Sequence, residues 1–159
     1  QHKKTLAVII VDAMGNTYGR TKDLIIVGKG NSNLDQIVES AAKQDKKYTE
    51  ADSEPEKGYF YRSDHFEFAK MGVPALYVDG GIDIRGKNKE YGRSKKTEYV
   101  KNHYHSTSDE IKDEWIYDGM IEDTKILFRV GYAISQHNEW PSWNEGTEFK
   151  AARDAMLAE

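Results

Sequence analysis

Three polar segments of the chain carry side chains whose types and spacing suit chemistry at a binding or catalytic site. The first is Asp12, which directly follows an apolar run at residues 6–11. Open α/β sheets bind ligands outside the carboxyl ends of their strands, so a carboxylate at such a position is a site candidate. Aspartate is also common in turns, and Asp12 precedes Gly15. On position alone, the turn role is favoured over a functional one.

The second segment reads Tyr61-Arg62-Ser63-Asp64-His65 and leads into a short helical pattern. Asp64 and His65 are adjacent, and both side chains can face one cleft. Ser63 or Asp64 is equally suited to cap the N-terminus of the helix, and Arg62 is suited to a surface ion pair. Without further context, the capping interpretation is favoured.

The third segment contains His103, Tyr104 and His105, followed by Asp109. Neutral imidazole is the commonest protein ligand for metals such as zinc, and a ligating histidine usually donates its other ring N–H to a carboxylate or carbonyl. Asp109 is close enough in sequence to accept that bond from His105, or to cap the next helix. His103 and His105 lie on one face of an extended segment, so they could also ligate together. Two solvated histidines in a loop are an equally good interpretation.

Apolar runs predict the strands that would position these residues. Residues 5–11 form an unalternating run rich in β-branched side chains, which is typical of a strand buried on both faces. Two further strands are predicted at residues 24–27 and 73–78. A strand buried on both faces requires helices on both sides of its sheet, so the pattern predicts an α/β fold in which helices flank the sheet.

Helical periodicity predicts the remaining elements. The predicted helices are residues 34–42, residues 65–71, a long segment that Asp113 would cap, and a C-terminal segment from Thr147. Residues 43–58 are highly charged and predict a solvated loop. Residues 79–103 are rich in Gly and Lys and predict a second, longer loop. This loop could wall the pocket, and an ordinary surface loop is at least as good an interpretation.

Composition narrows the classes of function. The chain has 159 residues, which fits a single domain over residues 1–159. The absence of cysteine excludes disulfides, thiolate zinc sites and a cysteine nucleophile. Lys and Arg number 23 against 27 Asp and Glu, and the net charge of −4 argues against a nucleic-acid-binding domain. The longest apolar run is far shorter than the ~20 residues of a membrane span.

Taken together and in this order, the three segments resemble the C-terminal half of a family M28 zinc peptidase, the aminopeptidase group that includes the glutaminyl cyclases. The resemblance covers nearly the whole chain. It is strongest in three stretches, Val11-Asp12-Ala13-Met14-Gly15, Tyr61-Arg62-Ser63-Asp64-His65-Phe66 with Gly72-Val73-Pro74-Ala75, and Tyr104-His105-Ser106-Thr107-Ser108-Asp109-Glu110. It implies part of a mixed β-sheet flanked by helices, as in zinc-dependent exopeptidases.

The resemblance also implies a metal centre. In this family the aspartate after such a strand is a metal ligand, which corresponds to Asp12. The histidine of the late Tyr-His pair is a ligand of the partner metal, which corresponds to His105 in preference to His103. The intact enzyme would hold two zinc ions, which polarise the scissile carbonyl of a peptide substrate and activate a water molecule.

Further roles follow from the same resemblance. A tyrosine hydroxyl stabilises the oxyanion in related peptidases, and Tyr104 matches one version of that arrangement, with Tyr61 or Tyr59 as the reserve. Asp64 matches a carboxylate beside the general base and is assigned a supporting catalytic role. Tyr61 and Arg62 are expected to contact the substrate.

The sequence departs from the family pattern in one respect, and this departure leads us to expect a fragment. A family site also needs a first His, a bridging Asp, a Glu general base and a further acidic ligand, all from the half that precedes a strand such as residues 5–11. Asp12 and His105 alone do not satisfy a catalytic zinc ion, which normally has three protein ligands. We therefore expect these residues to be a fragment, inactive by itself, whose truncated sheet invites self-association.

Two alternatives remain open at this stage. Glutaminyl cyclisation uses the same scaffold with one zinc ion and a tryptophan-lined pocket, whereas Trp115, Trp140 and Trp143 look structural. A non-catalytic interaction module of the same fold is the second alternative. Proteins of this kind are mostly exported by bacteria, which gives an expectation of a periplasmic or secreted location.

Overall fold

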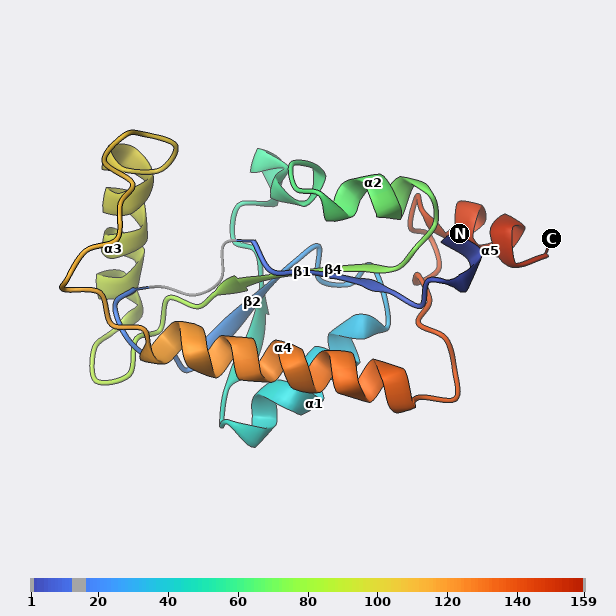
Figure 1. Cartoon of the computed structure of the whole chain (residues 1–159), viewed down its shortest axis with the longest axis horizontal. Helices are drawn as coiled ribbons and strands as arrows, with labels where there is room; N and C mark the ends of the chain where they lie inside the picture. The colour runs from blue at the N-terminus through green and yellow to red at the C-terminus, as the bar shows by residue number, and fades with distance from the viewer. Residues whose placement is uncertain (1, 13–16, 159) are drawn as a thin grey trace.

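A four-stranded mixed sheet forms the centre of the molecule (Figure 1). The computed structural model describes residues 2–12 and 17–158. The strands are β1 (Val8–Ile10), β2 (Asp23–Val27), β3 (Tyr48–Ala51) and β4 (Ala75–Gly80), arranged in the order β1-β4-β2-β3. β1 runs parallel to β4, β4 antiparallel to β2, and β2 parallel to β3. The predicted α/β class is confirmed.

Helices cover both faces of this sheet, as Figure 1 shows. The long helices α1 (Leu34–Gln44) and α4 (Asp118–Gln136) lie on one face. Short helices lie over the other face; they are η2 (Pro55–Lys57), η3 (Tyr59–Tyr61) and α2 (His65–Lys70). Helix α3 (Lys89–Asn102) stands at the end of the sheet toward which β4 points, and η1 (His2–Lys4) and α5 (Lys150–Ala158) lie together at the opposite end. No helix in the described part of the chain is long and apolar enough to cross a bilayer.

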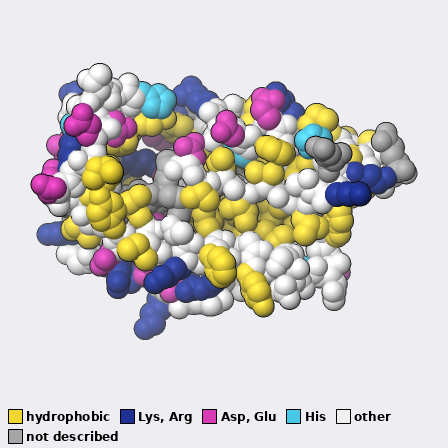
Figure 2. Space-filling view, viewed as in Figure 1, with side chains coloured by type: hydrophobic (Ala, Val, Ile, Leu, Met, Phe, Trp, Pro, Cys, Tyr) yellow, Lys and Arg dark blue, Asp and Glu magenta, His cyan; other side chains and the backbone are white. Residues whose placement is uncertain are grey.

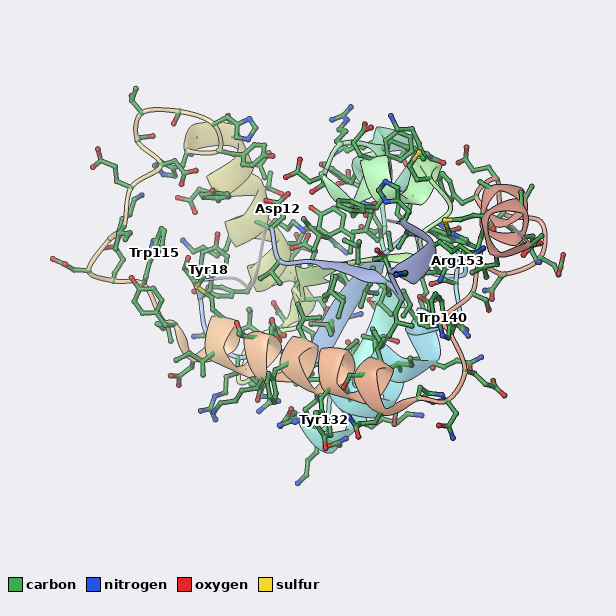
Figure 3. The ribbon with its side chains drawn as sticks, turned by 45° about the vertical axis from the view of Figure 1, so that its right-hand side comes forward. Asp12, Tyr18, Trp115, Tyr132, Trp140 and Arg153 are labelled. Carbon is green, nitrogen blue, oxygen red and sulfur yellow. The ribbon has the colours of Figure 1, made fainter. Side chains whose placement is uncertain are left out.

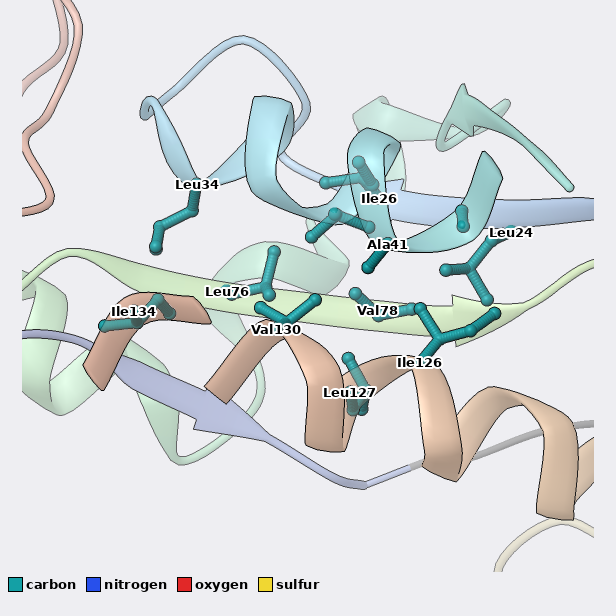
Figure 4. Packing of buried hydrophobic residues seen from close by; sticks show 12 residues of the cluster. Leu24, Ile26, Leu34, Ala41, Leu76, Val78, Ile126, Leu127, Val130 and Ile134 are labelled. Carbon is teal, nitrogen blue, oxygen red and sulfur yellow. The ribbon is translucent and has the colours of Figure 1, made fainter. Parts of the chain in front are cut away.

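Alternating side chains of β4 divide the core between the two faces. Leu76 and Val78 point toward α1 and α4 and join the larger apolar cluster (Figure 4). Ala75 and Tyr77 point to the other face and join a smaller aromatic cluster with Phe60. A strand buried on both faces, with helices on each side, explains why the continuous apolar pattern of residues 73–78 predicts β4 correctly.

The prediction for residues 5–11 is wrong in one respect. Only Val8–Ile10 form a strand, and all three residues are half-buried because β1 is the edge strand of the sheet. The backbone N–H of Val8 donates to the carbonyl of Pro74. Alternate residues of a parallel strand face the same neighbour, so the N–H and C=O of Ile9 face the open edge, where no described residue pairs with them.

Both predicted loops contain regular structure. Residues 43–58 include β3 and η2, and residues 79–103 include the end of β4 and all of α3. Helix α3 has little apolar periodicity to detect. Local polar contacts support it instead, because the Asn88 side chain caps the N–H of Tyr91 and Glu90 pairs with Arg93.

The long C-terminal helices begin later than predicted. Asp113 caps nothing, since α4 starts at Asp118 with Tyr117 as its N-cap. The last helix starts at Lys150 rather than Thr147. Helix ends depend on local hydrogen bonds that apolar spacing does not reveal.

Candidate functional site

Asp12 and the Ser63 segment, far apart in the sequence, meet at the carboxyl end of β1. The hydroxyl of Ser63 donates to Asp12 Oδ2 at 2.8 Å. Figure 3 places Asp12 between the sheet and α3. Neither Ser63 nor Asp64 provides the predicted helix cap, since no side chain caps the start of α2. The alternative turn role of Asp12, and the matching residues Ala13 to Gly15, involve positions 13–16, which lie outside the described residues.

A second carboxylate, which the sequence analysis did not identify, lies on β4 at the same end of the sheet as Asp12. Ile10 pairs with Tyr77, and this is the last pair in the β1–β4 register. Two residues after this pair are Asp79, still within β4, and Asp12, beyond the end of β1. Asp79 forms an ion pair with Lys96 of α3. Asp79 reaches this end of the sheet next to β1 only through the pairing of β4 with β1, so no local signal in the sequence could have found it.

Two buried polar side chains lie beneath these carboxylates. Tyr77 is 9% exposed, and its pKa is raised by burial and by the nearby charges of Asp79 and Asp12. His65 is fully buried, with its ring centroid 5.2 Å from that of Tyr77 and 4.6 Å from that of Phe60. Burial lowers the pKa of His65, and neither ring nitrogen forms a well-aligned hydrogen bond with a described residue.

The His105 loop is attached to the C-terminal end of α3. His105 has a φ of 57°, in the left-handed region that costs a non-glycine residue roughly 1–3 kcal/mol. Its ring stacks on Tyr104 with the centroids 3.9 Å apart, and both side chains are exposed.

His103 and Asp109 are engaged within the same loop. His103 Nδ1 lies 2.9 Å from the Ser108 hydroxyl. Asp109 accepts a hydrogen bond from the Tyr99 hydroxyl at 2.9 Å, and burial together with that bond raises the pKa of Tyr99 to about 12. The expectation that Asp109 supports His105 or caps a helix is therefore not met. His105 is the histidine of this loop whose ring is held by stacking alone among the described residues.

The other predicted site residues lie on or next to η3. The Tyr61 hydroxyl donates to Glu148 at 3.0 Å, so this phenol is directed toward the C-terminal segment. Arg62 is exposed and lies 6.0 Å from the centre of the Tyr59 ring. Asp64 is exposed at the start of α2.

Asp12 and His105 suit zinc by their chemistry, because carboxylate oxygen and imidazole nitrogen are both common zinc ligands. Among residues 2–12 and 17–158, however, no three His, Asp or Glu side chains lie close enough together to hold a metal ion. The described residues therefore offer two donors of the right kind and not a complete zinc site.

The fold and the position of Asp12 define an α/β protein whose candidate site lies beyond the carboxyl end of a strand, as in many hydrolases built on open sheets. The model of Peptidase family M28 matches residues 1–127. The chain therefore belongs to this family, which supports a peptidase type of hydrolase function. No curated protein and no solved structure gives a significant match.

Proposed function

We propose that this chain carries part of the active site of a zinc aminopeptidase, in which Asp12 and His105 each bind one of two zinc ions. The hydrogen bond from Ser63 to Asp12 is the observation that carries the proposal, because it fixes a carboxylate where α/β proteins bind ligands. The left-handed backbone at His105 adds support, since such strain is concentrated at functional sites.

In this proposal each side chain has a separate task. The chemistry that bound zinc supplies is polarisation of the scissile carbonyl and activation of a water molecule. Tyr104 is exposed beside His105, and its hydroxyl donates a hydrogen bond to the oxyanion that develops on the carbonyl. Asp64 supports the general base, and Tyr61 and Arg62 contact the peptide.

The remaining metal ligands and the general base come, in this proposal, from polypeptide outside these 159 residues. The count of donors supports this, because catalytic zinc normally has three protein ligands and the described residues bring no third donor to Asp12 or His105. We therefore propose that the chain is inactive by itself. We further propose a periplasmic or secreted location.

The direct test compares two proteins, the chain alone and the longest product of its gene, in hydrolysis of leucine p-nitroanilide with added Zn²⁺. We expect activity only from the longer protein, and its loss with a zinc chelator. Asp12→Asn and His105→Ala should each abolish hydrolysis in that protein, whereas His103→Ala should retain it. Full activity of the His105→Ala variant would refute the assignment.

Two of the three tryptophans give the glutaminyl cyclase alternative no support. Trp143 is buried and donates its indole N–H to the carbonyl of Gly72 at 2.9 Å. Trp140 lies over the Arg153 guanidinium, 5.3 Å from it, at the end of the molecule away from Asp12 (Figure 3). Neither lines the region of Asp12. Formation of pyroglutamate from a peptide with N-terminal Gln would favour the cyclase, and lack of both reactions would favour a non-catalytic module.

A further inference from the structure

We propose that Asp79 binds the ammonium group of a basic substrate side chain, and that Lys96 of α3 occupies this position in the free protein. The inference rests on the proposed peptidase function, because it places a specificity-determining carboxylate beside Asp12. It concerns recognition of the substrate rather than the hydrolytic step.

The sheet register places Asp79 at the site. Val8 pairs with Ala75, Ile9 with Leu76 and Ile10 with Tyr77, so the parallel strands β1 and β4 advance together. Asp79 follows this last pair by two residues within β4, and Asp12 follows it by two residues beyond the end of β1. Both carboxylates lie near enough to Tyr77 to raise its pKa, so a substrate held at Asp12 has Asp79 at the same end of the sheet.

The ion pair with Lys96 shows that the Asp79 carboxylate can bind an ammonium group. The Lys96 ammonium group pairs with Asp79 Oδ2, although Lys96 belongs to a helix beyond the end of the sheet. The lysine side chain is 47% exposed and that of Asp79 is 21% exposed. Exposed ion pairs contribute only about 0.2–1 kcal/mol, so a cationic side chain of similar chemistry can replace Lys96.

Buried polar groups independently mark this part of the sheet as a binding region. The Tyr77 side chain is nine-tenths buried on the same face as Asp79, two residues back along β4. His65 beside it is fully buried, and neither ring nitrogen forms a well-aligned hydrogen bond with a described residue. Buried polar groups are normally hydrogen-bonded, so the His65 ring is better suited to a ligand than to a core.

A second pair of a carboxylate and a lysine, on β3 and α3, differs from the pair of Asp79 and Lys96. Glu50 of β3 lies two strands away from Asp79 at the same level of the sheet and pairs with Lys89 of α3 at 2.6 Å. Lys89 also lies 5.3 Å from the centre of the Tyr48 ring. Lys89 is therefore held by two partners and Lys96 by one, so Lys96 is the lysine that a substrate can displace.

The test is NMR titration of the ¹⁵N-labelled chain at low ionic strength with two probes. Nα-acetyl-lysine methylamide carries only a side-chain ammonium, and norleucine amide carries only an α-ammonium. We expect the lysine probe to shift the amide signals around Asp79 in a saturable way. Lys96→Met should tighten its binding about two- to fivefold, as expected for release of an exposed ion pair. Asp79→Asn should remove the binding.

Lys101→Met is the matched control, because Lys101 is exposed on the same helix and has no ion-pair partner among the described residues; it should leave binding unchanged. Binding of norleucine amide alone, or equal binding by wild type and Asp79→Asn, would overturn the proposal. The titration needs neither zinc nor hydrolysis. Its failure is therefore distinct from failure of the peptidase assignment, which the hydrolysis assay tests.

Discussion

At the scale of single residues, Ser63 is the side chain that positions Asp12. Its hydroxyl supplies the one hydrogen bond that orients the carboxylate within the described chain. Groups that orient a metal ligand in this way affect metal affinity nearly as strongly as the ligands themselves. Ser63 therefore links the N-terminal end of α2, where Asp64 lies, to the carboxyl end of β1.

Replacing Ser63 with alanine should weaken Zn²⁺ binding by roughly tenfold, because the Asp12 carboxylate loses its orienting donor. Isothermal titration calorimetry on the longest product of the gene measures this directly. Ser53→Ala is the control, since Ser53 is exposed and makes no hydrogen bond with a described residue. Equal affinity in Ser63→Ala and wild type would mean that Asp12 does not bind the metal.

Asp123 should make stability depend on pH in an unusual direction. It is buried on α4, accepts a hydrogen bond from the fully buried Lys47 at 2.5 Å, and has a pKa raised by burial to about 6 from its ordinary 3.8. The folded state thus binds a proton that the unfolded state has released. This contribution to stability is complete below about pH 4 and is lost as the pH rises through 6.

The comparison with Asp123→Asn isolates this effect, because asparagine does not titrate. We expect the difference in unfolding free energy between wild type and variant to change by on the order of 1–3 kcal/mol between about pH 4 and 7. Urea denaturation across that range provides the measurement. Asp113→Asn, at an exposed position, should show no such change. A constant difference for Asp123→Asn would contradict the raised pKa.

At the scale of elements, α3 holds the His105 loop in place. Gly92 allows α3 to approach the 82–84 segment closely, since a Cβ at this position would lie 2.0 Å from the carbonyl oxygen of Ile82. The Tyr99 hydroxyl then ties the helix to Asp109 at the far end of the loop. The helix that the sequence analysis missed is therefore the element that presents His105.

Gly92→Ala should destabilise the chain by about 1–3 kcal/mol, because a methyl group here overpacks α3 against backbone. Hydrogen exchange should also speed up in the loop at residues 103–109. Gly131→Ala is a matched control on α4, where the new Cβ would meet only the Ile9 side chain at 3.7 Å. That helical substitution should be neutral or stabilise by up to ~1 kcal/mol. Loop exchange that is unchanged in Gly92→Ala would show that α3 does not position His105.

The sequence predicted some elements and missed others for identifiable reasons. Strands β2 and β4 and helix α1 have apolar patterns, and each lies within a few residues of its predicted position. Strand β3 and helix α3 are polar, so periodicity could not reveal them. Among candidate site residues, Asp12 was proposed from its place after a strand together with the family resemblance, and its role stays a prediction. Asp79 was not found, because its role depends on pairing between strands distant in the chain.

At the scale of the whole molecule, the open edge of β1 is the main feature. Figure 2 shows hydrophobic side chains gathered over the face formed by β1 and α4. Val11 is 58% exposed and Phe128 is 74% exposed. Strand edges in stable monomers are normally protected by charge, proline or covering segments, whereas residues 5–11 have no charged side chain.

We expect a second copy of the chain to cover this edge, because two uncharged β1 edges can pair antiparallel without like-charge repulsion. Analytical ultracentrifugation at tens of micromolar should show a dimer. Val11→Lys should yield a monomer, since lysine next to a strand edge opposes pairing. Phe128→Lys should do the same by placing a charge on the exposed apolar side of α4. Ile111→Lys, at a position that is 80% exposed and belongs to neither β1 nor α4, should remain dimeric. A monomeric wild type would contradict the expectation.

The central claim is that one carboxylate and one imidazole of this chain belong to a single metal centre. Titration of the ¹⁵N- and ¹³C-labelled longest product of the gene with Zn²⁺ tests it most directly, with the His105 ring nitrogens and the Asp12 carboxyl carbon as reporters. We predict that both signals shift over the same range of Zn²⁺ concentration while those of His103 do not, and that Asp12→Asn weakens the shift at His105. Shifts at His103 instead, or at His105 independently of Asp12, would contradict the claim.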